Sequence, residues 1–339
     1  MAEVMLYDTT LRDGAQMEGI AYSVEDKLKI TQKLDEIGID YIEGGWPGAN
    51  PKDSEFFERV KGIKLAHAQI AAFGSTRRAN TSAARDSGIL ALEQAGTDIV
   101  TLVGKSWDLH VKHVLETTLE ENLAMIKDSI SYLRGQGKTV FYDAEHLFDG
   151  FKNNQEYALS SIKAADLAGA ACIILCDTNG GAIPSDVISV VKRVKGEIMV
   201  PLGIHSHDDT EMAVANSVSA IQAGVTQVQG TINGYGERCG NANLCSIIPN
   251  LKIKLGIDCV NDEQLVRLTE ASRFVSEIAN MGLDGYQAYV GTSAFTHKAG
   301  LHASAMSKVE ESYQHVYPEM VGNVKRVLVS ELAGRSNIV

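Results

Sequence analysis

The sequence predicts an α/β protein with a (β/α)8 barrel over residues 1–280, followed by a connector and a small helical subdomain over residues 281–339. Four times a helix-like segment ends at a glycine and runs into an apolar, β-rich stretch, at Gly38, Gly96, Gly169 and Gly224. A helix that ends at a C′ glycine before a buried strand is typical of an α-to-β junction. These glycines are 58, 73 and 55 residues apart, so each interval has room for two strand–helix units of about 30 residues.

The strands between these junctions are visible as short apolar stretches at residues 4–7, 69–73, 140–142 and 201–205. Helical periodicity fills the gaps: valines recur at positions 187, 190, 191 and 194, and Ser23 is a predicted N-cap. Eight such units at this chain length favour a closed barrel over an open doubly wound sheet. An open sheet would also be expected to carry a glycine-rich dinucleotide loop after its first strand, and residues 8–14 contain none. Residues 261–280 predict a further helical stretch.

Composition and charge exclude several classes of protein. The chain has 31 Lys and Arg against 43 Asp and Glu, a net charge of −12, which argues against a nucleic-acid or membrane-surface protein. No stretch approaches 18 uninterrupted apolar residues, so no membrane-spanning helix is expected. The five cysteines include no Cys-x-x-Cys pair. Together with the absence of a charged-then-apolar leader, they predict reduced thiols in a cytoplasmic protein.

In a barrel of this kind the active site lies at the C-terminal ends of the strands. The sequence places polar or aromatic side chains after every predicted strand. They are Asp8, Arg12, Asp13, Gln16, Glu43, Trp46, Arg77, Arg78, Lys105, Ser106, Asp108, His110, Asp143, Glu145, His146, Asp177, Thr178, Asn179, His205, His207, Asp208, Asp209, Asn233, Glu237, Arg238 and Asn241.

The pair His205-Ser206-His207 predicts a divalent-metal site, because residues i and i+2 of a strand point to the same side. The alternative is that one histidine caps a backbone carbonyl and the other faces solvent. Asp13 is the expected carboxylate partner, on the loop that leaves the first strand. Asp8 is the competing candidate, although hydrogen bonding to the turn after it is the simpler role. Such a ligand set does not choose among Mg, Mn and Zn.

Arg12 is predicted to stabilise an oxyanion or enolate beside the metal. The alternative is a structural ion pair with Glu43 or Glu145. Glu145 itself is expected either as an acid/base or as a residue that orients others. Thr178, at the end of the sixth strand, could hold a substrate carboxylate through its hydroxyl.

Four motifs in order resemble a known family: residues 8–16 (DTTLRDGAQ), the histidine pair, residues 234–243 (GYGERCGNAN) and residues 297–302 (HKAGLH). The chain is similar over essentially its whole length to the 2-isopropylmalate and homocitrate synthase family, also called DRE-TIM metallolyases. Residues 43–51, 104–110, 142–146 and 244–250 resemble its citramalate synthase branch most. The resemblance implies a metal-dependent Claisen condensation of acetyl-CoA with pyruvate, followed by thioester hydrolysis, in a homodimeric enzyme of isoleucine biosynthesis.

The resemblance also implies roles for individual residues. Asp13, His205 and His207 match metal ligands, and Asn241 matches a residue at or near the metal. Arg12 matches the enolate-stabilising residue, while Gln16, His110, Glu145 and Thr178 match residues near acetyl-CoA or the keto acid. His302 and Tyr313 match residues of a small subdomain that, in relatives, reaches into the active site of the neighbouring subunit. This pair is expected to act as the general base, in preference to Glu145.

Other functions stay open at this point. A different keto acid would make the chain a 2-isopropylmalate or homocitrate synthase, since one methylene is worth only about 1–3 kcal/mol of discrimination. A lyase of the same fold would run a retro-aldol or retro-Claisen cleavage, and a non-catalytic barrel would have lost its ligands. The C-terminal regulatory domain of many relatives is expected to be absent from these 339 residues.

Overall fold

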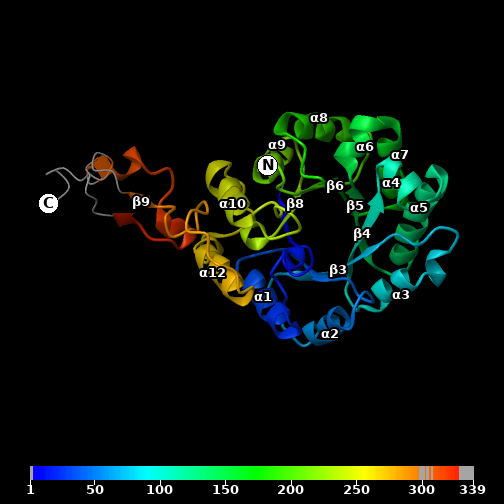
Figure 1. Cartoon of the computed structure of the whole chain (residues 1–339), viewed down its shortest axis with the longest axis horizontal. Helices are drawn as coiled ribbons and strands as arrows, with labels where there is room; N and C mark the ends of the chain where they lie inside the picture. Colours follow the sequence, from blue (N-terminus) through cyan, green and yellow to red (C-terminus); the bar gives the residue numbers. More distant parts are fainter. Residues whose placement is uncertain (1–2, 298–301, 303–304, 307, 328–339) are drawn as a thin grey trace.

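Eight parallel strands close into a barrel in sequence order, with β8 paired to β1 in the computed structural model of the chain (Figure 1). The structure describes residues 3–297, 302, 305–306 and 308–327. The strands are β1 (Met5–Asp8), β2 (Tyr41–Gly45), β3 (Gln69–Ser75), β4 (Ile99–Lys105), β5 (Thr139–Glu145), β6 (Cys172–Asp177), β7 (Leu202–Ser206) and β8 (Gln227–Gly230). The predicted (β/α)8 barrel is confirmed.

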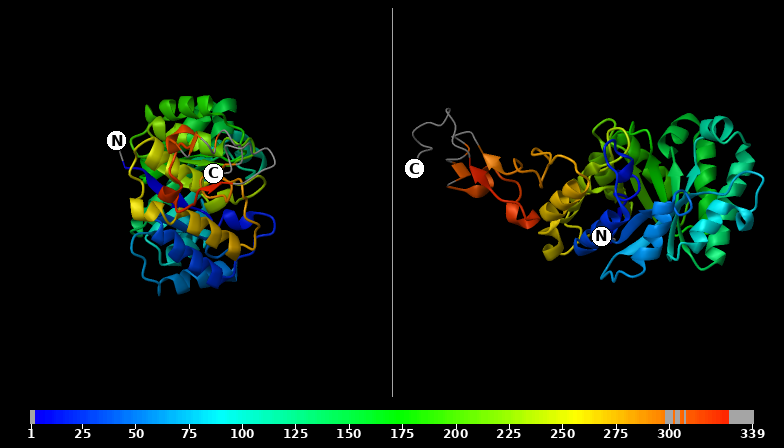
Figure 2. Two further views of the ribbon diagram at one scale, coloured as in Figure 1. Left: turned by 90° about the vertical axis from the view of Figure 1, so that its left-hand side faces the viewer. Right: turned by 60° about the horizontal axis from the view of Figure 1, so that its bottom comes forward.

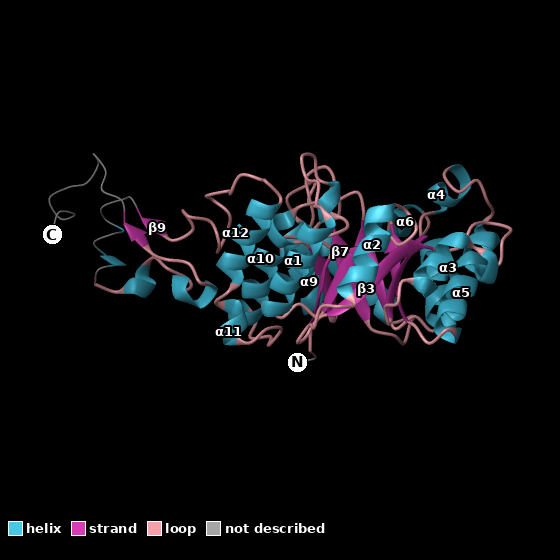
Figure 3. Cartoon of the chain, turned by 90° about the horizontal axis from the view of Figure 1, so that it is seen from below, coloured by secondary structure: helices cyan, strands magenta, loops and turns pink. Residues whose placement is uncertain are grey.

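Helices surround the strands on the outside, as the secondary-structure colouring shows (Figure 3). They are α1 (Val24–Glu36), α2 (Pro51–Val60), α3 (Ser87–Gln94), α4 (Asp108–His113), α5 (Leu119–Gly135), α6 (Leu147–Asn153), α7 (Gln155–Ala168), α8 (Pro184–Lys195), α9 (Ala213–Gln222), α10 (Leu244–Pro249), α11 (Asp262–Leu265) and α12 (Leu268–Ile278). The predicted N-cap Ser23 accepts a hydrogen bond from the backbone N–H of Asp26, whose carboxylate in turn accepts one from the Ser23 N–H. This reciprocal pair fixes the start of α1.

The four junction glycines adopt the backbone conformation that the sequence predicts. Their φ angles are 83° at Gly38, 78° at Gly96, 85° at Gly169 and 102° at Gly224. L-residues rarely adopt this left-handed region, whereas glycine does so without a steric penalty. The repeat in the sequence is therefore the repeated turn from a helix into the next barrel strand.

The barrel interior changes from apolar to polar toward the C-terminal ends of the strands. At the bottom, an aromatic group of Tyr7, Tyr41 and Phe141 packs with the buried side chains of Ile99 and Ile174. Alternate residues of a strand face the same side, so inward positions above this floor carry the site. On β5 they run from Phe141 to Asp143 and then to Glu145. The polar side chains of the site therefore lie above a layer of packed apolar and aromatic side chains.

The C-terminal segment extends away from the barrel beyond α10 and α12 (Figures 1 and 2). It contains a short two-stranded sheet of β9 (Thr296–His297) and β10 (Arg326–Val327) and the 3-10 turns η5 (Glu310–Ser312) and η6 (Pro318–Val321). We propose that the boundary between the barrel and this segment lies near residue 280.

The described part of the chain contains no helix with the length and apolar character needed to span a lipid bilayer. All five cysteines are free thiols, and Cys172 and Cys176 are buried in the barrel as expected.

Candidate active site

A cavity of about 670 Å³ opens at the C-terminal ends of the strands, where the sequence places its polar residues. Its lining includes many of the predicted side chains. They are Arg12, Asp13, Gln16, Trp46, Arg77, Arg78, Lys105, Asp143, Glu145, Thr178, His205, His207 and Glu237. Apolar side chains of Phe73, Val103 and Met125 complete one wall. The cavity is large enough for small ligands and is charged at its base.

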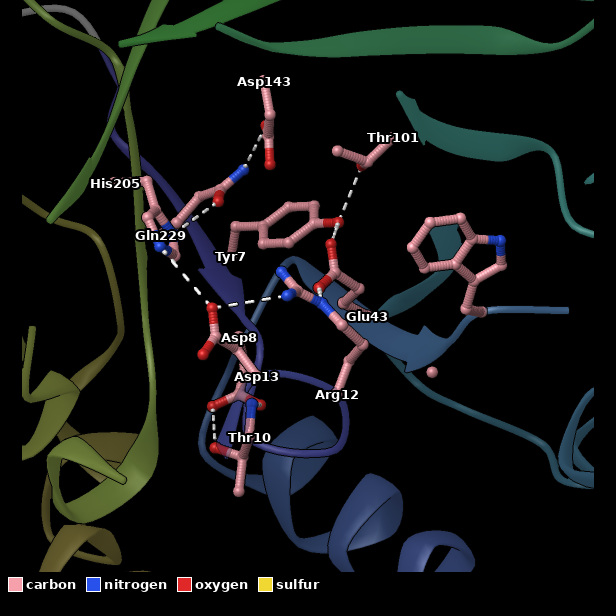
Figure 4. Close-up of polar contacts among 12 residues, drawn as sticks. Tyr7, Asp8, Thr10, Arg12, Asp13, Glu43, Thr101, Asp143, His205 and Gln229 are labelled. Carbon is pink, nitrogen blue, oxygen red and sulfur yellow. Dashed lines mark hydrogen bonds and ion pairs between the residues drawn. The ribbon is translucent and has the colours of Figure 1, made fainter. Parts of the chain in front are cut away.

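Asp13, His205 and His207 converge at the base of this cavity. Figure 4 shows Asp13 and His205 among their polar contacts. The carboxylate oxygen Oδ2 of Asp13 lies 3.6 Å from Nε2 of His205 and 3.9 Å from Nε2 of His207. One ligand atom from each of the three residues lies within 4.8 Å of the others. The sequence prediction that these three residues meet is therefore confirmed in geometry.

The protonation of this cluster suits a cation. Burial and the neighbouring His207 lower the pKa of His205 to about 3, and burial also lowers the pKa of His207. Burial works to raise the pKa of Asp13. The charge of Arg12, and the charges that His205 and His207 carry when they are protonated at acidic pH, outweigh it and lower that pKa to about 2. Neutral imidazoles beside an ionised carboxylate are the ligand forms that divalent metals require.

Buried polar atoms without hydrogen-bond partners also indicate that the cluster fits a metal ion. Oδ1 of Asp13 and Oδ1 of Asn241 are buried and accept no hydrogen bond from any described residue. The backbone of Asn241 bridges to His207, and its amide nitrogen donates to the carbonyl oxygen of Tyr235. Its oxygen is thus left free, as expected of a residue at or near a metal. Buried acceptors without partners are costly, so the residues present fit a bound divalent ion.

Arg12 is fixed in the cavity from two sides. Its Nε donates to Oε1 of Glu43, and its guanidinium carbon lies 4.0 Å from the centre of the Phe73 ring. Its Nη1 also lies 3.4 Å from Oδ2 of Asp13. Burial works to lower the pKa of Arg12, but the charges of Glu43 and Asp13 outweigh it and raise the pKa. The ion pair with Glu43 exists, and it leaves the guanidinium at the cavity wall.

Asp8, the competing carboxylate, has another role. Its two oxygens accept hydrogen bonds from the backbone N–H and the hydroxyl of Thr10 at 2.8 and 2.7 Å. The hydroxyl of Thr10 in turn accepts from the backbone N–H of Ile232. Asp8 therefore holds the loop that carries Asp13 against the loop after β8. Its carboxylate is not part of the three-residue cluster.

Glu145 and Thr178 both line the cavity and both have partners. Glu145 forms an ion pair with Lys105 from the neighbouring strand β4. The oxygen of Thr178 accepts a hydrogen bond from the backbone N–H of His146 at 2.9 Å, which leaves the hydroxyl hydrogen free to donate. Gln16 is exposed at the cavity rim, on the turn that follows Asp13.

The two adjacent arginines at the rim are neutralised by carboxylates. Arg77 pairs with Glu121 and Asp128, and Arg78 pairs with Asp86. Phosphate binding by these residues would have to compete with those ion pairs.

Three of the residues with a predicted catalytic or substrate-binding role lie elsewhere. The described residues that line the cavity do not include His110, because its position on α4 stacks it on Trp107, with ring centres 5.3 Å apart, and near His146. His302 and Tyr313 belong to the C-terminal segment and also lie outside the cavity lining of their own chain. Their rings stack on each other with centres 4.1 Å apart.

Sequence reasoning missed three polar residues inside the barrel, Tyr7, Thr101 and Gln229, which pair with the predicted residues Glu43, Asp143 and His205. The hydroxyl of Tyr7 donates to Glu43 at 2.6 Å and lies 2.7 Å from the hydroxyl of Thr101. Gln229 connects His205 to Asp143 (Figure 4). The available signal was the alternation of Gln227 and Gln229 in an otherwise apolar strand, which puts two amides on one face.

Comparison with known proteins identifies the family of this chain. The model of the HMGL-like family matches residues 3–275, and the model described as "Homocitrate synthase post-HMGL domain-like" matches residues 289–339. The chain is 57% identical to (R)-citramalate synthase from Geobacter sulfurreducens over 339 residues, which is 100% of this chain and 64% of that protein. It is 34% identical to homocitrate synthase AksA from Methanopyrus kandleri, covering 99% of this chain and 81% of that protein.

Among solved structures, the HMG-CoA lyase from Brucella melitensis superposes with a TM-score of 0.69 at 18% identity, covering 83% of this chain and 100% of that one. This likeness concerns the fold. The chain spans less than two thirds of the (R)-citramalate synthase that it matches at 57% identity. The family match covers most of the chain and includes every strand of the barrel, so the chain belongs to the HMGL-like family.

Proposed function

We propose that the protein is a citramalate synthase, which condenses acetyl-CoA with pyruvate and hydrolyses the thioester to release citramalate and CoA. The observation that carries this proposal is the 57% identity to an (R)-citramalate synthase over the whole chain, with the carboxylate and imidazole cluster in place at the cavity base.

We propose Asp13, His205 and His207 as the metal ligands and Asn241 as a further ligand or neighbour, the metal being Mg, Mn or Zn. When bound, the metal would supply Lewis-acid polarisation of the keto acid. Arg12 would face the oxygen on which negative charge develops, held in one orientation by Glu43 and Phe73. Thr178 would donate a hydrogen bond from its free hydroxyl to the keto-acid carboxylate. Gln16 would contact the substrate at the rim of the cavity.

We propose that the general base acts in the site of a second copy of the chain. His302 and Tyr313 stack on each other outside the cavity lining of their own chain. A homodimer would bring this pair to the partner's cavity. The base would take a proton from the acetyl methyl group, and the resulting carbanion would add to the ketone carbon of pyruvate. Water would then attack the thioester carbonyl, and the thiolate of CoA would leave. Glu145 is held by Lys105, so it is better placed to orient groups than to act as this base.

Release of the CoA thiol from acetyl-CoA tests the proposal. The purified chain would be assayed with pyruvate, 2-oxobutyrate, 2-oxoisovalerate and 2-oxoglutarate, with Mn²⁺ or Mg²⁺ and with a chelator. We expect metal-dependent release with a preference for pyruvate. A preference for 2-oxoisovalerate or 2-oxoglutarate would keep the chemistry and change the substrate. A product formed from a single acyl-CoA without a keto acid would identify a lyase instead.

A further inference from the structure

The buried amide of Gln229 contacts His205 on the ring nitrogen that faces away from Asp13. Nδ1 of His205 lies 3.0 Å from Oε1 of Gln229, while its Nε2 faces Asp13 at 3.6 Å. A carbonyl oxygen accepts hydrogen bonds and cannot donate them, so Nδ1 must carry the proton in this arrangement. The lone pair of a neutral imidazole then lies on Nε2, on the side of the cluster.

The nitrogen end of the amide faces Asp143. The amide nitrogen Nε2 of Gln229 donates to Oδ1 of Asp143 at 3.1 Å, across the barrel from strand β8 to strand β5 (Figure 4). This bond turns Oε1 toward His205. Reversal of the amide would place an N–H group against Nδ1 and would move the imidazole proton to Nε2, where it would block a metal.

Both residues of this connection are enclosed. Gln229 has no exposed surface and Asp143 is 4% exposed. Burial, and then the charge of Glu43, raise the pKa of Asp143 well above its ordinary value. Gln229, which makes both hydrogen bonds, is thus enclosed, and an enclosed amide that loses a partner does not readily replace it with water.

We infer that Gln229 and Asp143 are positioning residues that fix the Nδ1–H tautomer of His205 and thereby present its Nε2 lone pair to the metal. This inference rests on the proposed metal site and names two residues that act on it without touching the metal. Outer partners of this kind typically change metal affinity by about 10–100-fold when they are replaced.

Two readouts on the full chain test the inference. The first is the tautomer of His205 in the metal-free protein, from ¹⁵N NMR of its ring nitrogens, assigned by the loss of these signals in His205→Asn. The second is the Kd for Mn²⁺, from the signal of free Mn²⁺ in electron paramagnetic resonance. Gln229→Met keeps the length of the side chain and removes the acceptor. We expect a mixture of tautomers and a Kd raised by about 10–100-fold.

The chain offers a matched control on the same strand. Gln227 is also buried and faces the same side two residues earlier, and its Oε1 accepts no hydrogen bond from the described residues. Gln227→Met should leave the tautomer and the Kd unchanged. Asp143→Asn still offers an oxygen to Gln229 and should stay within a few-fold of the wild-type Kd. Asp143→Leu removes this oxygen and should shift both readouts.

The outcomes separate this inference from the proposed function. A wild-type Kd and a single tautomer in folded Gln229→Met would overturn the inference and leave the metal site intact. A wild-type protein that binds no Mn²⁺ would overturn the metal site and the inference with it. A rise in Kd for Gln227→Met equal to that for Gln229→Met would also contradict the inference, because it would show a general effect of barrel packing.

Discussion

The guanidinium carbon of Arg12 lies 4.0 Å from the centre of the Phe73 ring, while its Nε donates to Glu43. The ring presents its negative face to the cation, and the carboxylate fixes the rotation of the guanidinium plane. Glu43 in turn accepts a hydrogen bond from the buried hydroxyl of Tyr7. The cation at the cavity wall is thus oriented by Phe73 within the wall and by Glu43 and Tyr7, which are not among the residues that line the cavity.

Arg12→Lys should retain the charge and lose this orientation. A lysine ammonium has no plane to lie against Phe73 and no fixed fork to divide between Glu43 and the cavity. We expect kcat for CoA release to fall by about 10²–10³-fold, the range found when one oxyanion donor is removed. The surface change Arg59→Lys is the control and should have full activity. Wild-type turnover in Arg12→Lys would mean that Arg12 acts only through its charge.

Asp8, the last residue of β1, and Asp13, on the loop that follows, are carboxylates with different predicted effects on metal binding. Asp13→Asn removes the only carboxylate of the three-residue cluster, so we expect the Kd for Mn²⁺ to rise by more than about 100-fold. The thermal stabilisation by Mn²⁺ should disappear with it, since a ligand stabilises only the state that binds it. In Asp8→Asn, Mn²⁺ binding and the thermal stabilisation by Mn²⁺ should both be retained. Equal losses of Mn²⁺ affinity in the two variants would mean that Asp13 is wrongly assigned as the carboxylate ligand.

The pH dependence of stability should contain a contribution from Asp8. Burial raises the pKa of its carboxyl group to about 7 in the folded protein, from an ordinary value of 3.8. The folded state therefore binds a proton more tightly than the unfolded chain does. The resulting stabilisation is fully present below the unfolded pKa and is lost as pH rises through the folded pKa.

Urea unfolding of wild type and Asp8→Asn at pH 5 and pH 8 measures this contribution. Asparagine resembles the protonated acid and does not titrate. We expect the stability of the wild type relative to the variant to fall by about 2 kcal/mol between the two pH values. A constant difference between the proteins would show that Asp8 has no raised pKa.

A mixing experiment tests whether the base comes from a second copy. His302→Asn and Asp13→Asn should each be inactive alone. If His302 serves the partner's cavity, a mixed dimer of the two variants contains one complete site. After subunit exchange, random pairing in a twofold dimer should restore about a quarter of the wild-type activity. Inactive mixtures that have formed mixed dimers would place the base within its own chain or assign it to another residue.

The junction glycines make a prediction about stability. Gly96 has a φ angle of 78°, and a Cβ at this position would meet only the flexible end of Lys61, so Gly96→Ala tests backbone conformation. We expect a loss of about 1–2 kcal/mol in the free energy of unfolding. Gly196 ends α8 with a φ angle of −78° and is the matched control. Gly196→Ala should be neutral or stabilising by up to about 1 kcal/mol. Equal effects at the two positions would contradict the proposed role of the junction glycine.

The sequence by itself predicted the barrel, its junctions and the convergence of Asp13, His205 and His207. These features depend on local rules: glycine ends a helix in the left-handed region, apolar periodicity separates strands from helices, and residues i and i+2 of a strand share a side. His205 and His207 could be paired from spacing alone. Asp13 could be added because the barrel brings the first loop close to the seventh strand.

Only the tertiary structure decided which polar groups meet inside the barrel. The contacts of Gln229 with Asp143 and of Tyr7 with Glu43 join strands that are 86 and 36 residues apart in sequence. Their partners depend on the stagger of the closed sheet and on side-chain rotamers, and no periodicity encodes these. The same holds for His110, whose ring packs on Trp107 instead of lining the cavity. Local sequence determines which side of a strand a residue faces, whereas the packing of the whole barrel determines what it touches.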